Sequence, residues 1–218
     1  MIASGVILRC AAVAGALGLW FWTQRVVSKK APTGNRIHDL VHEWTEPLND
    51  WLGARPRAAN ATLIVTSLFI DLFGLFLLGS AIFGSSLRPF LALILVFLMR
   101  QLCQLTFTLP VPGKMIWRNP GFPALLVTYG TSNDFFFSGH TACAVVGAIE
   151  IARIAPPAVG AVAYAIAAIE AATVIVLRAH YTIDVFAAIF AAWGAESIAQ
   201  KIAPSLDAWL HALAAHAF

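Results

Sequence analysis

Residues 61–83, ATLIVTSLFIDLFGLFLLGSAIF, form a long apolar stretch in which Asp71 is the single charged residue, and this stretch indicates the fold class of the chain. About 20 apolar residues in a helix are enough to cross the hydrocarbon core of a bilayer. The rest of the chain has the same character: 60% of its 218 residues are hydrophobic and only 11% are charged, whereas soluble domains carry roughly 25% charged residues. The bilayer is therefore the predicted solvent.

Five further apolar stretches predict an all-α fold, a bundle of six transmembrane helices forming one membrane domain over residues 1–218. The spans are expected at residues 7–27, 61–83, 90–109, 138–154, 158–178 and 181–202. The first contains Arg9 inside its apolar run and ends on bulky aromatic residues. It is therefore interpreted as a membrane anchor rather than a cleaved signal peptide.

Two links between the spans are long. Residues 28–60 carry apolar side chains at three- and four-residue spacing, which predicts an amphipathic helix on the membrane surface. Pro47 is expected to interrupt or kink that helix. Residues 110–137 are rich in Pro and Gly and cannot form a straight helix. The amphipathic set is Ile37, Leu40, Val41, Trp44, Leu48 and Trp51.

Composition also excludes some classes of function. The net charge is only +3, and without a dense Lys/Arg stripe it argues against a nucleic-acid partner. The three cysteines are odd in number and widely spaced, which argues against a disulfide framework and a cysteine metal site. The pattern indicates no particular oligomeric state.

Topology predicts where two histidines meet. With six spans, residues 28–60, residues 110–137 and the junction at 178–180 lie on one face of the membrane. His140 begins the fourth span and His180 begins the sixth. Both histidines are therefore expected to enter the membrane from that same face.

The residue types at these helix starts predict a catalytic triad of His140, His180 and Asp184. His180 and Asp184 are four residues apart and share one side of a helix. A carboxylate bonded to one imidazole nitrogen leaves the other nitrogen as a nucleophile, and His140 would be the second acid–base group. Amides of Ser138 and Gly139 at the helix start would bind a phosphate oxygen.

Spacing alone leaves other interpretations open. A carboxylate inside an apolar span usually marks function or a paired site, and a structural ion-pair network would look similar. Two histidines and an aspartate could also bind zinc, but the H-E-x-x-H type of spacing is missing. We therefore predict neither a metal nor a cofactor.

The strings FSGHT at residues 137–141 and HYTIDV at residues 180–185 resemble the lipid phosphatase/phosphotransferase superfamily of type 2 phosphatidic acid phosphatases. They look closest to the branch of sphingomyelin synthases and phosphatidylcholine:diacylglycerol cholinephosphotransferase. Further matches are PLND at 47–50, Arg100 followed by LPVPG at 109–113, and Asn133-Asp134. The resemblance implies the six-helix fold of that superfamily, a phosphohistidine on His180, His140 as proton donor, and no metal.

Departures from the phosphatase pattern favour transfer over hydrolysis. Phosphatase members usually carry a K-x6-R-P element and an arginine six residues before the second histidine, where this chain has Val174. We expect transfer of a phosphocholine-like headgroup between lipids such as phosphatidylcholine and diacylglycerol or ceramide. The alternatives are a phosphatase of phosphatidate or a lipid pyrophosphate, and an inactive lipid-binding membrane protein.

Other side chains must neutralise the phosphate. Arg178 is expected to be best placed, two residues from His180. Arg100 lies within a span and could pair structurally with Asp71. Lys114 and Arg118 are the other candidates, for which headgroup anchoring is equally open.

Asp134, with Trp117, Phe135 and Phe136, could receive a quaternary ammonium. The same aromatic residues could instead be interfacial anchors.

The orientation in the membrane has two indicators that disagree. Lys and Arg are more frequent on the face of the predicted site, and the positive-inside rule would place that face in the cytoplasm. The family resemblance implies the exoplasmic or lumenal side, and the expectation follows the resemblance.

Overall fold

The computed structural model describes residues 2–29, 37–106, 108–129 and 135–217 of the chain. Within these ranges the fold is all-helical, with eight helices and no strand. They are α1 (Ile2–Val27), α2 (Leu40–Trp44), α3 (Glu46–Gly53), α4 (Pro56–Phe83), α5 (Arg88–Thr106), α6 (Gly139–Ile154), α7 (Pro157–Val176) and α8 (Thr182–Ala217).

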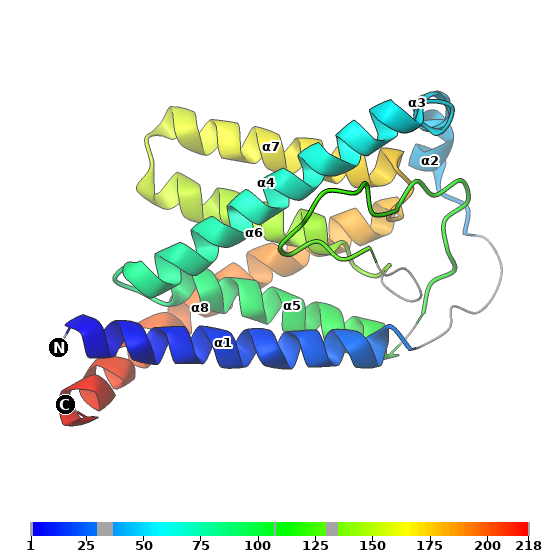
Figure 1. The fold of residues 1–218 in the computed structure, drawn as a ribbon. Coiled ribbons are helices and arrows are strands. Elements are labelled where there is room, and N and C mark those ends of the chain that lie inside the picture. The colour runs from blue at the N-terminus through cyan, green and yellow to red at the C-terminus, as the bar shows by residue number, and fades with distance from the viewer. Residues whose placement is uncertain (1, 30–36, 107, 130–134, 218) are drawn as a thin grey trace.

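Six of these helices run back and forth along one bundle (Figure 1). The short helices α2 and α3 lie at one end of it, together with the long link between α5 and α6. Helix α1 begins, and α8 finishes, at the opposite end. The arrangement gathers the starts of α6 and α8 at the end that holds the long links, as the topology argument requires.

Five helices of the described residues are long and apolar enough to cross a membrane, so the chain is a multi-pass membrane protein. They are Gly5–Val26, Pro56–Phe83, Arg88–Thr106, Pro157–Val176 and Thr182–Ala215. Helix α6, expected to span at residues 138–154, has 16 residues and a length of about 24 Å, shorter than a hydrocarbon core of about 30 Å. It runs antiparallel to α5 and α7 and packs against α4, α5, α7 and α8.

Small residues form the helix interfaces and large apolar residues face outward. On α8, Ala188 and Ala192 are fully buried, whereas Phe190 and Trp193 are each 67% exposed. This distribution is typical of membrane helices, because small side chains allow backbones to approach while lipid solvates the large ones. Where α4 crosses α6, a Cβ at Gly147 would lie 2.4 Å from the Phe73 ring.

The long link between the first two expected spans, residues 28–60, differs from its prediction. The expected amphipathic helix, interrupted or kinked at Pro47, is instead two short helices, and the break lies at Thr45 rather than at Pro47. Pro47 lies in the first turn of α3, where the missing N–H and the fixed φ of proline are compatible with a helix. Most of the amphipathic set does face outward, and Trp44 is 70% exposed.

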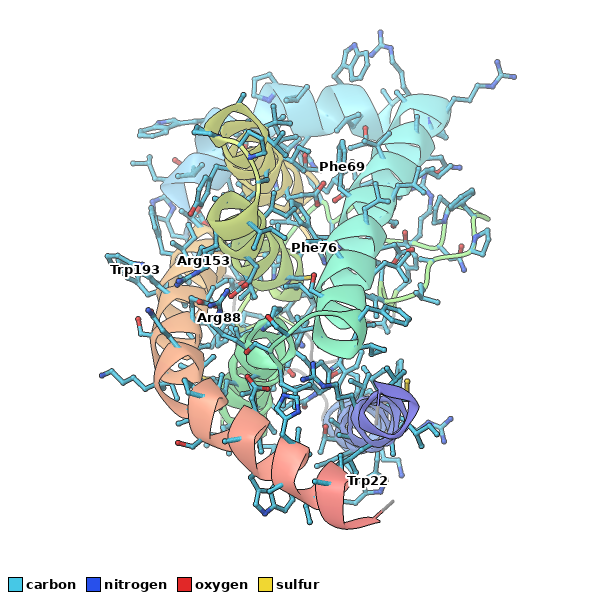
Figure 2. All side chains as sticks on the ribbon, turned by 90° about the vertical axis from the view of Figure 1, so that its left-hand side faces the viewer. Trp22, Phe69, Phe76, Arg88, Arg153 and Trp193 are labelled. Carbon is cyan, nitrogen blue, oxygen red and sulfur yellow. The ribbon has the colours of Figure 1, made fainter. Side chains whose placement is uncertain are left out.

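A buried charge network holds the opposite end of the bundle. Arg88 donates to both carboxylate oxygens of Glu150, at 2.9 and 2.8 Å. Arg153 lies 2.8 Å from Glu196. Figure 2 shows Arg88 and Arg153 among the helices at this end, where the network joins α5, α6 and α8. The last helix also continues to Ala217, well beyond the expected end at residue 202.

Candidate active site

His180 lies in the tight turn between α7 and α8, where a backbone carbonyl holds its ring. The Nδ1–H of His180 donates to the carbonyl oxygen of Phe135 at 2.7 Å. The Asp184 carboxylate, expected to make that hydrogen bond, lies 3.6 Å from Nδ1. The Phe135 carbonyl therefore selects the tautomer and leaves Nε2 unprotonated, while Asp184 is close enough to stabilise a positive charge on the ring.

Asp184 connects the starts of two helices. Its Oδ2 accepts a hydrogen bond from the Tyr181 amide at 2.8 Å, so Asp184 reaches back to cap the start of α8. Its backbone carbonyl accepts from the Ser138 amide at 3.2 Å, at the start of α6. The side chain is fully buried. Asp184 thus holds His140 and His180 in register through their two helix starts.

Ser138 and Gly139 have different positions at the start of α6. The Ser138 hydroxyl caps the helix by accepting from the Thr141 amide at 3.2 Å, and the Ser138 amide is used by Asp184. Gly139 belongs to the first helical turn, whose amides have no intrahelical acceptor. A Cβ at Gly139 would lie 3.3 Å from Arg100 Nε. The glycine therefore allows the Arg100 guanidinium to approach the helix start.

His140 and His180 line the same pocket, together with Arg100 and Gly139. Apart from this polar end, most of its lining is apolar and comes from α1, α4, α5 and the link that precedes α6. The His140 ring meets Trp117 edge-on, with ring centroids 5.0 Å apart. Two histidines 40 residues apart in sequence therefore face one amphipathic cavity.

Arg100 is the cation of this pocket. It is 4% exposed, and its Nε donates to the Phe137 carbonyl at 2.6 Å. The expected pair with Asp71 is not formed in the described part of the chain. The Asp71 carboxylate instead accepts from the amides of Leu125 and Leu126, each at 2.9 Å, and so holds the long link against α4.

The structure places the other predicted cations outside this pocket. Arg178 adopts a positive φ of 58° and donates to the His42 carbonyl and to the Thr45 hydroxyl. Lys114 pairs with Glu46 at 2.7 Å on the exposed surface. Arg118 donates to Asn60 at 2.9 Å. Arg178, predicted as the best-placed phosphate ligand, instead connects helix α2 to the α7–α8 turn.

Asp39 and His42 support the turn that carries His180, and neither was predicted from the sequence. His42 Nε2–H donates to the His180 carbonyl at 2.9 Å. The Asp39 carboxylate accepts from the amide and hydroxyl of Thr182, at 2.6 and 2.8 Å. Burial raises the pKa of Asp39, but hydrogen bonds from Thr182 and the His42 amide outweigh it and hold that pKa below its ordinary value. The sequence signal that could have identified Asp39 was its type, that of a helix N-cap residue, directly before a run of periodic apolar residues.

Of the predicted choline-binding residues, Trp117 and Phe135 line the pocket. Phe136 lies edge-on to Phe137, with centroids 6.1 Å apart. Asp134 lies outside the described residues. In the part of the chain that the structure describes, no three His, Cys, Asp or Glu side chains gather closely enough to hold one metal ion.

Comparisons with known proteins give a family and one relative. The family model described as AtPDCT1/2 matches residues 38–201. Phosphatidylcholine:diacylglycerol cholinephosphotransferase 1 of Arabidopsis thaliana is 22% identical over 183 residues, which cover 84% of this chain and 60% of the relative. The match thus spans less than two thirds of that protein. No solved structure matches.

Proposed function

Because the chain belongs to the AtPDCT1/2 family, we propose that it is a membrane enzyme that transfers a phospho-alcohol headgroup between lipids. Phosphatidylcholine is the proposed donor, and a diacylglycerol or ceramide hydroxyl is the proposed acceptor. The relative's name supports phosphocholine as the group transferred. The observation that carries the proposal is the shared pocket, in which His140, His180 and Arg100 face an otherwise largely apolar cavity.

In the first step, Nε2 of His180 attacks the phosphorus of the donor lipid. A P–N bond forms and the bond from phosphorus to the glycerol oxygen breaks, while His140 gives its proton to the leaving alkoxide. The Phe135 carbonyl accepts from Nδ1–H throughout, and the Asp184 carboxylate, 3.6 Å away, stabilises the cationic ring. Arg100 and the Gly139 amide stabilise the charge on the phosphoryl oxygens.

In the second step, the acceptor hydroxyl attacks the phosphorus and gives its proton to His140. The P–N bond breaks, and both histidines return to their starting state. Hydrolysis would result if water entered instead of the lipid alcohol. The apolar walls of the pocket and the buried Val174, which stands at the position of the phosphatase arginine, favour a lipid acceptor.

We propose that α6 is a sixth membrane crossing, because it returns the chain between two spans that run the opposite way. The pocket would then open on the face shared by residues 28–60 and 110–137, on the exoplasmic or lumenal side. A cysteine introduced at Arg55 and a membrane-impermeant reagent test this orientation, in intact cells and in cells whose plasma membrane alone is permeabilised. Labelling that appears only after this permeabilisation would place the site in the cytoplasm.

The transfer itself is tested with the purified full chain in nanodiscs. Headgroup-labelled phosphatidylcholine is mixed with a diacylglycerol whose acyl chains are deuterated, and we expect labelled phosphatidylcholine that carries the deuterated chains. His180→Ala and His140→Ala should each abolish the product. His211→Ala changes a histidine near the far end of α8 and should leave transfer intact. Release of inorganic phosphate from phosphatidate with no headgroup exchange would overturn the proposal.

A further inference from the structure

Helix α1 supplies part of the pocket although it lies outside the family match. The match begins at residue 38, whereas Leu17, Trp20 and Gln24 of α1 line the same cavity as His140 and His180. Only 11% of the α1 span is buried within the protein, against 28–44% for the other four spans. Helix α1 therefore covers the side of the pocket more than it builds the core.

Trp20 brings a hydrogen-bond donor to this wall. Its ring packs on Phe97 of α5, with centroids 5.0 Å apart. The indole Nε1 is buried and has no hydrogen-bond acceptor among the described residues. An indole N–H can only donate, and buried donors normally have a partner. The N–H is thus an unpaired donor, which an acceptor on a molecule bound in this pocket would satisfy.

The position of Trp20 along the pocket indicates which atoms it would meet. Phe97 precedes Arg100 by three residues on α5, about 4.5 Å along a helix. The polar end of the pocket would hold the reacting oxygen and phosphorus, while Leu17, Leu78 and Ile94 provide apolar walls. In a glycerolipid, an ester carbonyl lies a few bonds from the reacting oxygen, between that oxygen and the acyl chain.

We propose that the Trp20 indole N–H donates to an ester carbonyl of the bound glycerolipid, and that α1 is the wall that selects the lipid. This inference rests on the proposed function and adds a binding residue to the same pocket. It predicts a preference for ester-linked over ether-linked diradylglycerols, since an ether has no carbonyl oxygen at that position. Ceramide, with an amide at a comparable position, would also satisfy the donor.

Trp20→Phe tests the hydrogen bond, because it removes the N–H and keeps an aromatic ring. We expect KM for dioleoylglycerol to rise about 10-fold with little change in kcat, the effect of one lost hydrogen bond. KM for the dialkyl ether analogue should not change. Trp22→Phe is the matched control on the same helix, because Trp22 is 62% exposed. An equal effect of Trp20→Phe on both lipids, or the same effect from Trp22→Phe, would overturn the inference.

A binding measurement separates this inference from the proposed reaction. His180→Ala protein in nanodiscs is photolabelled with a diazirine diacylglycerol, and ester- and ether-linked lipids compete. Better competition by the ester lipid, lost on Trp20→Phe, supports the inference even if no transfer occurs. Leu17→Trp should weaken photolabelling and the competition by both lipids, whereas Leu19→Trp, at a residue 54% exposed, should not. Equal competition by the two lipids in protein with Trp20 would contradict it.

Discussion

Replacing Asp39 by alanine should release helix α2 from the α7–α8 turn. The Asp39 carboxylate accepts four hydrogen bonds: from the amides of Val41 and His42 at 3.0 and 3.2 Å, and from the amide and hydroxyl of Thr182. The first two cap α2, and the other two connect α2 to the start of α8. Because α2 has only five residues, it is too short to be stable without such contacts.

The size of the effect follows from these contacts. Loss of an N-cap costs about 1 kcal/mol, and each hydrogen bond to a charged group contributes about 1.5–3 kcal/mol. The Asp39 side chain is only 7% exposed, so solvent would not fully replace the lost bonds. Taking the lower value for both Thr182 contacts, Asp39→Ala should destabilise the docking of α2 by roughly 4 kcal/mol, which corresponds to a roughly 1000-fold change in the docking equilibrium.

Hydrogen–deuterium exchange of the purified protein measures this change without an enzymatic assay. Peptides covering α2 and the first turn of α8 should lose roughly 100- to 1000-fold in protection. Glu43→Gln is the control, because Glu43 pairs with His38 on the surface at 3.1 Å, and exposed pairs contribute little. Protection in Asp39→Ala that remains within about twofold of the wild type would contradict this role of the Asp39 carboxylate.

Three further outcomes are expected. Burial lowers the pKa of His42 below its ordinary value of 6.5. The contribution of neutral His42 to the stability of the fold is therefore fully present above pH 6.5 and is lost as the pH falls from there toward the folded-state pKa. Thermal unfolding should show this pH dependence, and His42→Gln should remove it. Gly147→Ala should lower Tm, because the new Cβ would strike a ring of α4, whereas Gly194→Ala, which meets nothing within 4 Å, should not. Glu150→Gln should cost about 3 kcal/mol by removing the buried charge that Arg88 contacts most closely, at 2.8 Å, and leaving it only Glu196 at 3.8 Å. Equal unfolding midpoints of the single variant and Arg88→Met/Glu150→Leu would argue against that cause.

The sequence predicted the membrane class and most helix positions correctly, because both depend on local hydrophobicity and length. It also placed His140 and His180 at two helix starts on one face, since alternating links fix that topology. The catalytic roles of these residues stay predictions. The local sequence pattern did not predict that Pro47 lies in the first turn of a helix, because proline is compatible both with a helix start and with a kink.

Tertiary structure decided which partners hold the site. The Phe135 carbonyl lies 45 residues from His180 in the chain, and Thr182 lies 143 residues from Asp39. Such contacts depend on how helices pack and leave no local periodicity in the sequence. The positions of two arginines have the same origin. Arg178, at a positive φ, contacts residues of α2 and Thr45, whereas the absence of a Cβ at Gly139 leaves room for Arg100 beside the start of α6.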